Sequence, residues 1–65
     1  MEIMALRKAK HMTQEQLAKA VGVSQGAVSQ WEKGLTHPSY KAIPLLITAL
    51  ECTIDELYGN TEKAG

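Results

Sequence analysis

The chain has 65 residues, 45% of them hydrophobic, and seven Lys and Arg side chains balance seven Asp and Glu. This length allows one domain, the hydrophobic fraction excludes a disordered chain, and no apolar run approaches the roughly 20 residues that span a bilayer. The charge is unevenly divided, with six Lys and Arg against three acids in residues 1–41 (net +3) and one Lys against four acids in residues 42–65 (net −3).

Two helices are predicted in the first third of the chain. Residues 2–11 form the first, with apolar side chains on one stripe among good helix formers, and His11 stands where a left-handed residue often ends a helix. Thr13 opens the second, because Thr13 and Gln16 fit a capping box in which each side chain satisfies a free backbone N–H. Gly22 ends it, at a position that requires a positive φ.

A third helix is predicted to begin after Ser24, a favoured N-cap residue, and to end at Gly34. Its inward side holds Val28 and Trp31, which are three residues apart and so share one helical stripe. Trp31 is therefore predicted to be a core residue rather than a stacking aromatic. The outward arc is polar, with short side chains at its centre; it consists of Gln25, Gly26, Ser29, Gln30 and Lys33, with Ala27 at its border.

The fourth predicted helix follows a loop, and Ser39 is expected to be its N-cap. Its apolar residues recur at intervals of three and four up to Leu50, which is the pattern of an amphipathic helix. Pro44 would clash with the backbone of a helix that began at Tyr40. The helix therefore begins later, or its first turn is distorted.

A second capping box, Thr53 with Glu56, opens a short fifth helix that is expected to stop at Gly59. No strand pattern and no internal repeat accompany these helices. The sequence thus predicts an all-α protein, a compact bundle of five short helices, with one domain over residues 1–59. Residues 60–65 are expected to form a short flexible tail.

The order and spacing of these elements resemble the helix-turn-helix of phage repressors and Cro proteins, called lambda-repressor-like or XRE-type. The similar segments lie within residues 3–58: LR at 6–7, MTQ at 12–14, LA at 17–18, VGVS at 21–24, VSQWEKG at 28–34, PS at 38–39 and CTIDEL at 52–57. The resemblance implies that helix 24–33 reads the major groove of double-stranded DNA. It also implies a transcriptional regulator, in this family most often a repressor, acting as a homodimer on a two-fold symmetric operator.

Five positions of the third helix are candidates for base contact. Gln25 and Gln30 are the strongest, because a carboxamide matches adenine N6 and N7. Their placement within the motif favours base contact over the alternative, that they are ordinary exposed glutamines of a surface helix. Ser29 can donate to a base or a phosphate, and Ala27 either meets a thymine methyl group or packs. Gly26 departs from the family, which usually places a reading side chain there. It costs the helix about 1 kcal/mol relative to alanine and allows a closer approach of the backbone.

Six polar residues are candidates for contacts with DNA phosphates: Gln14, Ser24, Lys33, Thr36, His37 and Lys41. Gln14 matches the family position that contacts a phosphate, where the positive end of the helix dipole would assist its amide. Residues 35–37 lie in the loop after the third helix, where the family often has Lys or Arg. The lack of these basic residues here weakens the expected contact between this loop and a phosphate. A solvated mixture of charges without a partner would show the same charge distribution.

The remaining candidates are structural. Gly22 and Trp31 shape the motif, and the resemblance implies an ion pair between Arg7 and Glu32 that joins the first helix to the third. His11, His37 and Cys52 have no zinc-type spacing, so neither a metal nor a cofactor is expected. No nucleophile–base pair or Gly-rich phosphate loop is recognisable, so an enzyme is not expected.

Two alternative functions stay open at this point. An antitoxin of a toxin–antitoxin pair would need a protein partner, for which the acidic residues 51–62 are the only candidate surface. A helical protein-interaction module without DNA binding is favoured by the zero net charge and by Gly26. A lone cysteine and the absence of a signal-peptide pattern favour a reducing compartment, so a cytoplasmic protein without a membrane partner is expected.

Overall fold

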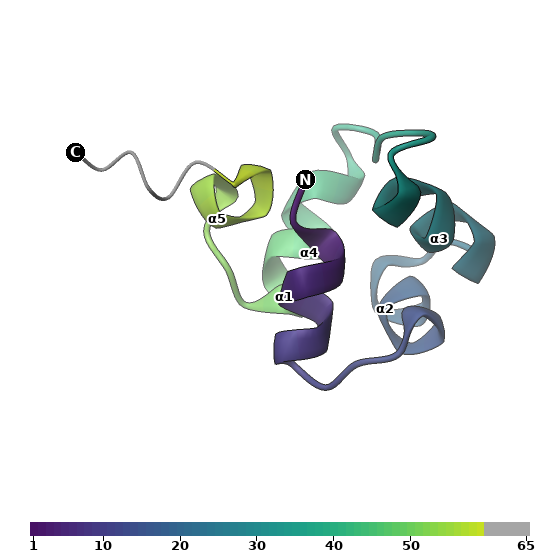
Figure 1. The fold of residues 1–65 in the computed structure, drawn as a ribbon, viewed down its shortest axis with the longest axis horizontal. Helices are drawn as coiled ribbons and strands as arrows, with labels where there is room; N and C mark the ends of the chain where they lie inside the picture. The colour runs from purple at the N-terminus through teal and green to yellow at the C-terminus, as the bar shows by residue number, and fades with distance from the viewer. Residues whose placement is uncertain (60–65) are drawn as a thin grey trace.

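In a computed structural model, residues 1–59 of the chain are described (Figure 1). They form five helices: α1 (Ile3–Ala9), α2 (Gln14–Val21), α3 (Gln25–Lys33), α4 (Ala42–Leu50) and α5 (Ile54–Tyr58). The predicted all-α bundle of five short helices is confirmed. None of these helices has the length and apolar character needed to cross a membrane. The predicted tail, residues 60–65, lies outside the described residues.

Side-chain caps fix the boundaries of α2 and α3. Thr13 Oγ1 accepts a hydrogen bond from the Gln16 backbone N–H at 3.0 Å, and Gln16 Oε1 accepts one from the Thr13 N–H at 2.8 Å. Ser24 Oγ accepts from the Ala27 N–H at 3.1 Å. Gly22 ends α2 with φ of 84°, a value that other residues rarely adopt. Both predicted caps and the predicted turn are confirmed, as is the capping box at the start of α5.

The Thr13 cap provides a direct stability test. Thr13→Ala is expected to lower the free energy of unfolding by about 1 kcal/mol, because the Gln16 N–H loses its acceptor. Urea denaturation followed by circular dichroism measures the change. Thr48→Ala is the control, since Thr48 is exposed within α4 and caps nothing. An equal loss in both variants would contradict the assignment.

The first helix is shorter than the predicted range 2–11. Its first residue is Ile3, because Glu2 occupies the N-cap position and accepts the Leu6 N–H at its carbonyl oxygen at 3.0 Å. The helix ends at Ala9, two residues before the predicted end, with Lys10 at the C-cap position. The left-handed residue expected at His11 is present, with φ of 58°. The chain then turns into Met12, whose side chain packs against the core.

The start of α4 corrects the prediction that Ser39 is its N-cap. Lys41 stands at that position without a side-chain capping bond, and the Ser39 carbonyl oxygen accepts the Ala42 N–H at 2.9 Å. Pro44 explains this later start, because it becomes the third residue of the helix. The N–H groups of the first turn have no intrahelical acceptor, so a proline is tolerated there without distortion.

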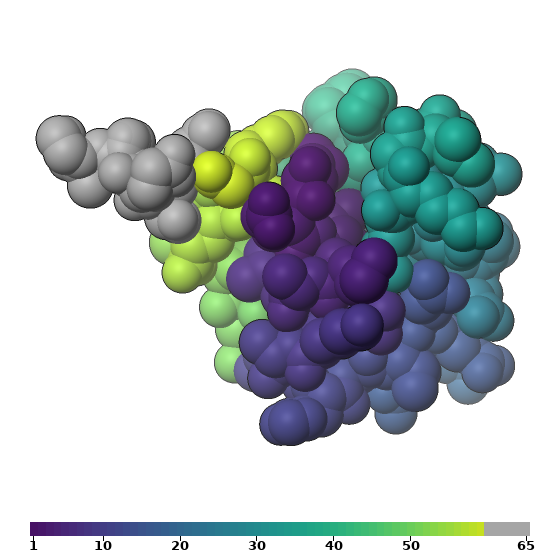
Figure 2. Space-filling model, viewed as in Figure 1, coloured from purple at the N-terminus to yellow at the C-terminus, as the bar shows by residue number. Residues whose placement is uncertain are grey.

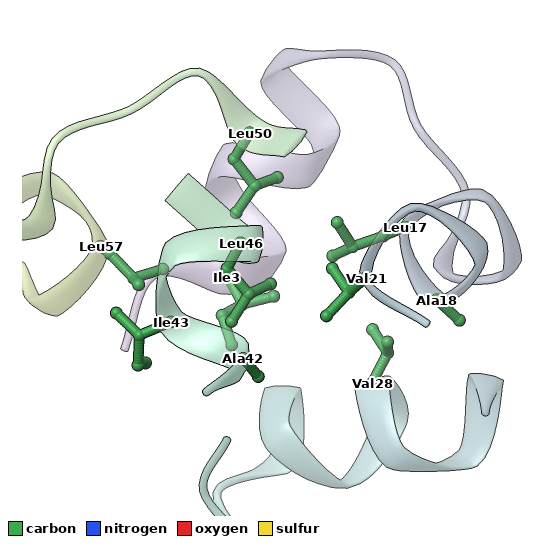
Figure 3. Packing of buried hydrophobic residues seen from close by; sticks show 10 residues of the cluster. All are labelled: Ile3, Leu17, Ala18, Val21, Val28, Ala42, Ile43, Leu46, Leu50 and Leu57. Carbon is green, nitrogen blue, oxygen red and sulfur yellow. The ribbon is translucent and has the colours of Figure 1, made fainter. Parts of the chain in front are cut away.

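All five helices contribute to one core, shown close up in Figure 3. Its buried residues are Ile3, Leu17, Ala18, Val21, Val28, Ala42, Ile43, Leu46, Leu50 and Leu57. From α3 only Val28 is fully buried, and Trp31 packs against the core while half-buried. The predicted inward stripe of α3 is thus correct but narrow. Gln25, Gly26, Gln30 and Lys33 of α3 are exposed.

Candidate nucleic-acid interface

The pair α2 and α3 forms the helix-turn-helix at one side of the molecule, and α5 lies at the opposite side (Figures 1 and 2). The turn is closed by two backbone bonds, in which the Ala18 carbonyl oxygen accepts from Gly22 at 2.8 Å and from Val23 at 3.0 Å. Val28 of α3 packs towards Val21 of α2 (Figure 3). These contacts hold α3 against α2, while Gln25 and Gly26 of its first turn are exposed.

The predicted base-contact residues share the first two turns of α3 but differ in exposure. Gln25, Gly26 and Gln30 are exposed, whereas Ala27 and Ser29 are half-buried. The half-burial of Ala27 agrees with its predicted place at the border of the arc. Ser29 is less accessible than its assignment to the outward arc implied. The exposed part of this face therefore consists of two carboxamides with a glycine between them.

A largely buried ion pair joins the last turn of α3 to α1. Arg7 donates from Nε to Glu32 Oε2 at 2.7 Å and from Nη2 to Glu32 Oε1 at 3.1 Å, while its Nη1 donates to the Met12 carbonyl oxygen at 2.8 Å. The side chains of Arg7 and Glu32 are only 11% and 3% exposed. The ion pair implied by the family resemblance is present and joins α1 to α3.

The ionised state of Glu32 is set by two opposing effects. Desolvation raises the pKa of the Glu32 carboxyl, but the hydrogen bonds from Arg7 and Gln14, with the charges of Arg7 and Lys8, outweigh it. The pKa consequently lies below its ordinary value of 4.5. In the other direction, the hydrogen bond to Glu32 raises the pKa of Arg7 despite its desolvation. Both side chains are charged at neutral pH, so the link between α1 and α3 is a true ion pair.

The ion pair continues towards the exposed face through Gln14. Gln14 Nε2 donates to Glu32 Oε1 at 2.9 Å, and its Oε1 accepts from Gln25 Nε2 at 3.4 Å. Sequence reasoning missed this connection, since the residues come from two helices and no local pattern joins them. Within residues 1–59, one amide hydrogen and the carbonyl oxygen of Gln25 have no hydrogen-bond partner. They are the two groups that an adenine edge requires.

The predicted phosphate-contact residues surround the exposed face of α3. Thr36, His37 and Lys41 are exposed on the segment between α3 and α4, and Lys33 is exposed at the end of α3. Ser24 Oγ accepts a backbone N–H as the cap of α3, which leaves its O–H free to donate. These candidates thus lie at both ends of α3.

The segment between α3 and α4 also carries two apolar side chains that sequence reasoning did not single out. Leu35 is 69% exposed and Tyr40 is 81% exposed. Their lack of burial has no local sequence signal, because the segment has no helical period that would assign them a side.

Other chemistry is not evident in the part of the chain that the structure describes. Residues 1–59 contain no group of three or more His, Cys, Asp or Glu side chains arranged to hold a metal ion. Burial, and then the charge of Glu56, raises the pKa of the half-buried Cys52 thiol. This thiol therefore stays protonated at neutral pH and packs against the core.

The chain is similar in sequence to three proteins that are named as transcriptional regulators or repressors. The chain is 38% identical over 61 residues to the HTH-type transcriptional activator BcrR of Enterococcus faecalis. It is 44% identical over 55 residues to Repressor protein C2 of Salmonella phage P22, and 40% identical over 58 residues to the HTH-type transcriptional regulator DicA of Escherichia coli K12. These alignments cover 94%, 85% and 88% of this chain, but the chain spans only 30%, 26% and 43% of the length of these relatives.

A solved structure shows the same arrangement of helices. The crystal structure of the P22 c2 repressor protein in complex with a synthetic operator superposes on this chain with a TM-score of 0.80. The two are 44% identical, and the superposition covers 85% of this chain and 83% of the other. In addition, residues 3–57 match the profile of the helix-turn-helix family. The chain therefore belongs to the helix-turn-helix family, in its lambda-repressor-like (XRE-type) form.

Proposed function

We propose that this chain binds double-stranded DNA sequence-specifically and regulates transcription. The observation that carries this proposal is the exposed first half of α3, held on α2 by the Gly22 turn, in a fold that superposes on a repressor bound to an operator at a TM-score of 0.80. Binding over a promoter would repress transcription by excluding the polymerase. The function is one of binding rather than catalysis, exerted in the cytoplasm.

In this proposal α3 enters the major groove with its first turns against the base edges. Gln25 and Gln30 pair with bases, because each exposed carboxamide offers a donor and an acceptor in one plane. Ser29 and Ala27 contribute shorter contacts from the border of the same face. Gln14, bonded to both Glu32 and Gln25, keeps the Gln25 amide in a fixed orientation.

The phosphate backbone is held from both ends of α3. Ser24 and Gln14 lie at the side of its first turn, and Lys33, Thr36, His37 and Lys41 follow its last turn. Two copies related by a two-fold axis would place their recognition helices in successive major grooves, with half-sites about 34–36 Å apart. A homodimer on a symmetric operator is therefore part of the proposal.

Selection from a library of random duplexes tests the proposal as a whole. The full chain, immobilised, is expected to enrich a two-fold symmetric site whose halves are one helical turn apart. Enrichment of an asymmetric site would contradict the homodimer. No enrichment of any sequence would contradict specific binding and would favour a protein-interaction module.

The role of Gln25 is tested on the selected duplex. Gln25→Ala is expected to lower discrimination by about 1–3 kcal/mol at one base pair in each half-site, since its bidentate contact is lost. Fluorescence anisotropy with the selected duplex and single-substituted duplexes measures this. Lys33→Ala is the contrasting variant, because a phosphate contact should weaken all duplexes equally. A uniform loss with Gln25→Ala would mean that Gln25 does not read a base.

A further inference from the structure

Gly26 differs from the other glycines of residues 1–59. Gly22, Gly34 and Gly59 have φ values of 84°, 77° and 82°, and each ends a helix in the left-handed region, where side chains are strained. Gly26 lies inside α3 with an ordinary helical backbone. Its conformation is therefore open to any L-residue, and the backbone does not explain the glycine.

Packing does not explain Gly26 either. A Cβ atom placed on it would meet one heavy atom within 4 Å, Ser24 Oγ at 3.8 Å, which is an ordinary van der Waals distance. Alanine is also the better helix former, by up to about 1 kcal/mol in a helix interior and less in the first turn, where Gly26 lies. In the free protein, helix propensity therefore favours alanine over glycine, and the packing permits alanine. No contact within the described chain explains the choice of residue.

The place of Gly26 on α3 points to its partner. It is exposed, follows Gln25, and lies one helical turn before Ser29 and Gln30, its neighbours at i+3 and i+4. When the first turns of α3 face base edges, a side chain at position 26 would stand between the helix backbone and the floor of the groove. Its absence leaves this space to the DNA.

We infer that Gly26 sets the depth at which α3 enters the major groove. Without a side chain there, the backbone of the first turn comes close to the base edges. This approach brings the short hydroxyl of Ser29 into contact and lets Gln25 and Gln30 pair with bases on either side. Gly26 is a specificity-determining residue through the space that it leaves, and this inference rests on the proposed DNA binding.

Gly26→Ala tests the inference in the full chain. Its urea midpoint is expected to equal or exceed that of the wild type, because the new Cβ makes only an ordinary van der Waals contact with Ser24 Oγ and alanine favours the helix. Its affinity for the selected duplex is expected to fall about tenfold or more, equivalent to 1.4 kcal/mol or more. Gly26→Leu should lose more affinity than Gly26→Ala, since its side chain is larger. Thr48→Ala, with its change on α4, should bind as the wild type does.

The outcomes separate this inference from the proposed function. If the wild type binds the selected duplex and Gly26→Ala binds it equally well or better, the inference is overturned and DNA binding stands. If Gly26→Ala is less stable than the wild type, an intramolecular need for glycine exists and the inference also fails. If the wild type binds no duplex, both fail. A loss of affinity confined to specific duplexes, with weak random-duplex binding at low salt retained, supports the inference.

Discussion

Replacing Arg7 with alanine is expected to lower the free energy of unfolding by about 3 kcal/mol. This is the lower end of the loss seen when one partner of a buried ion pair is removed. The Glu32 side chain is only 3% exposed, so the variant buries a carboxylate without its cation. The Met12 carbonyl oxygen also loses the donor that Arg7 Nη1 provides. Urea denaturation of the variant and the wild type measures the difference.

A second ion pair in the same chain serves as the matched control. Lys10 pairs with Glu51, but their side chains are 36% and 71% exposed. Solvent screens such a pair, so Lys10→Ala should leave the urea midpoint unchanged within error. Equal effects of Arg7→Ala and Lys10→Ala would contradict the role assigned to burial.

The double variant Arg7→Met with Glu32→Leu distinguishes the unpaired charge from the pair itself. It is expected to recover most of the stability lost in Arg7→Ala, because an apolar pair of similar volume is often as stable as a buried ion pair.

The free energy of unfolding of the double variant should also fall less than that of the wild type when the pH is lowered. The pKa of Glu32 is lowered in the folded protein, so its contribution to stability is complete above the ordinary value of 4.5 and is lost as the pH falls through the folded value.

Replacing Leu46 with alanine is expected to lower the free energy of unfolding by about 3 kcal/mol, within the usual 2–5 kcal/mol for a buried leucine. Leu46 is 0% exposed on α4, which packs against α2 and so supports the helix-turn-helix from behind. A domain of this size has a total stability of roughly 3–10 kcal/mol, so the variant should be close to unfolding. A urea titration followed by circular dichroism gives the midpoint.

Leu45 provides a control one residue away. It is 48% exposed, so Leu45→Ala removes the same atoms without leaving a closed cavity. Its urea midpoint should stay near that of the wild type. A similar loss in Leu45→Ala and Leu46→Ala would contradict the assignment of the inner face of α4.

The parts of the fold that the sequence predicted are those with a local code. Thr13 with Gln16, Ser24 and Gly22 each act on backbone groups within four residues, so their types and spacing suffice to place the boundaries of α2 and α3. The family resemblance extended this to the Arg7–Glu32 pair. These features fix the boundaries of α3 and its attachment to α1 and α2.

The features that the sequence did not predict depend on two local signals that favour different structures, or on contacts between residues that are distant in sequence. Ser39 is a good capping residue, but Pro44 moves the start of α4 to Ala42, and local preference alone does not rank these two signals. Glu51 adopts a left-handed φ of 54° without being glycine, at the end of α4, where it also pairs with Lys10 at the C-cap of α1. Gln14 of α2 bridges Glu32 and Gln25 only after α2 has packed against α3.

The central claim is that the exposed face of α3 binds DNA, and the salt dependence of binding tests it most directly. Anisotropy of a labelled random duplex with the full chain should show binding at low salt that weakens as salt rises. If Lys33 and Lys41 of two protomers each neutralise one phosphate, the log–log slope is roughly −3.6, and Lys33→Ala should make it shallower. Binding that is independent of salt, or no binding at any salt, would contradict the account.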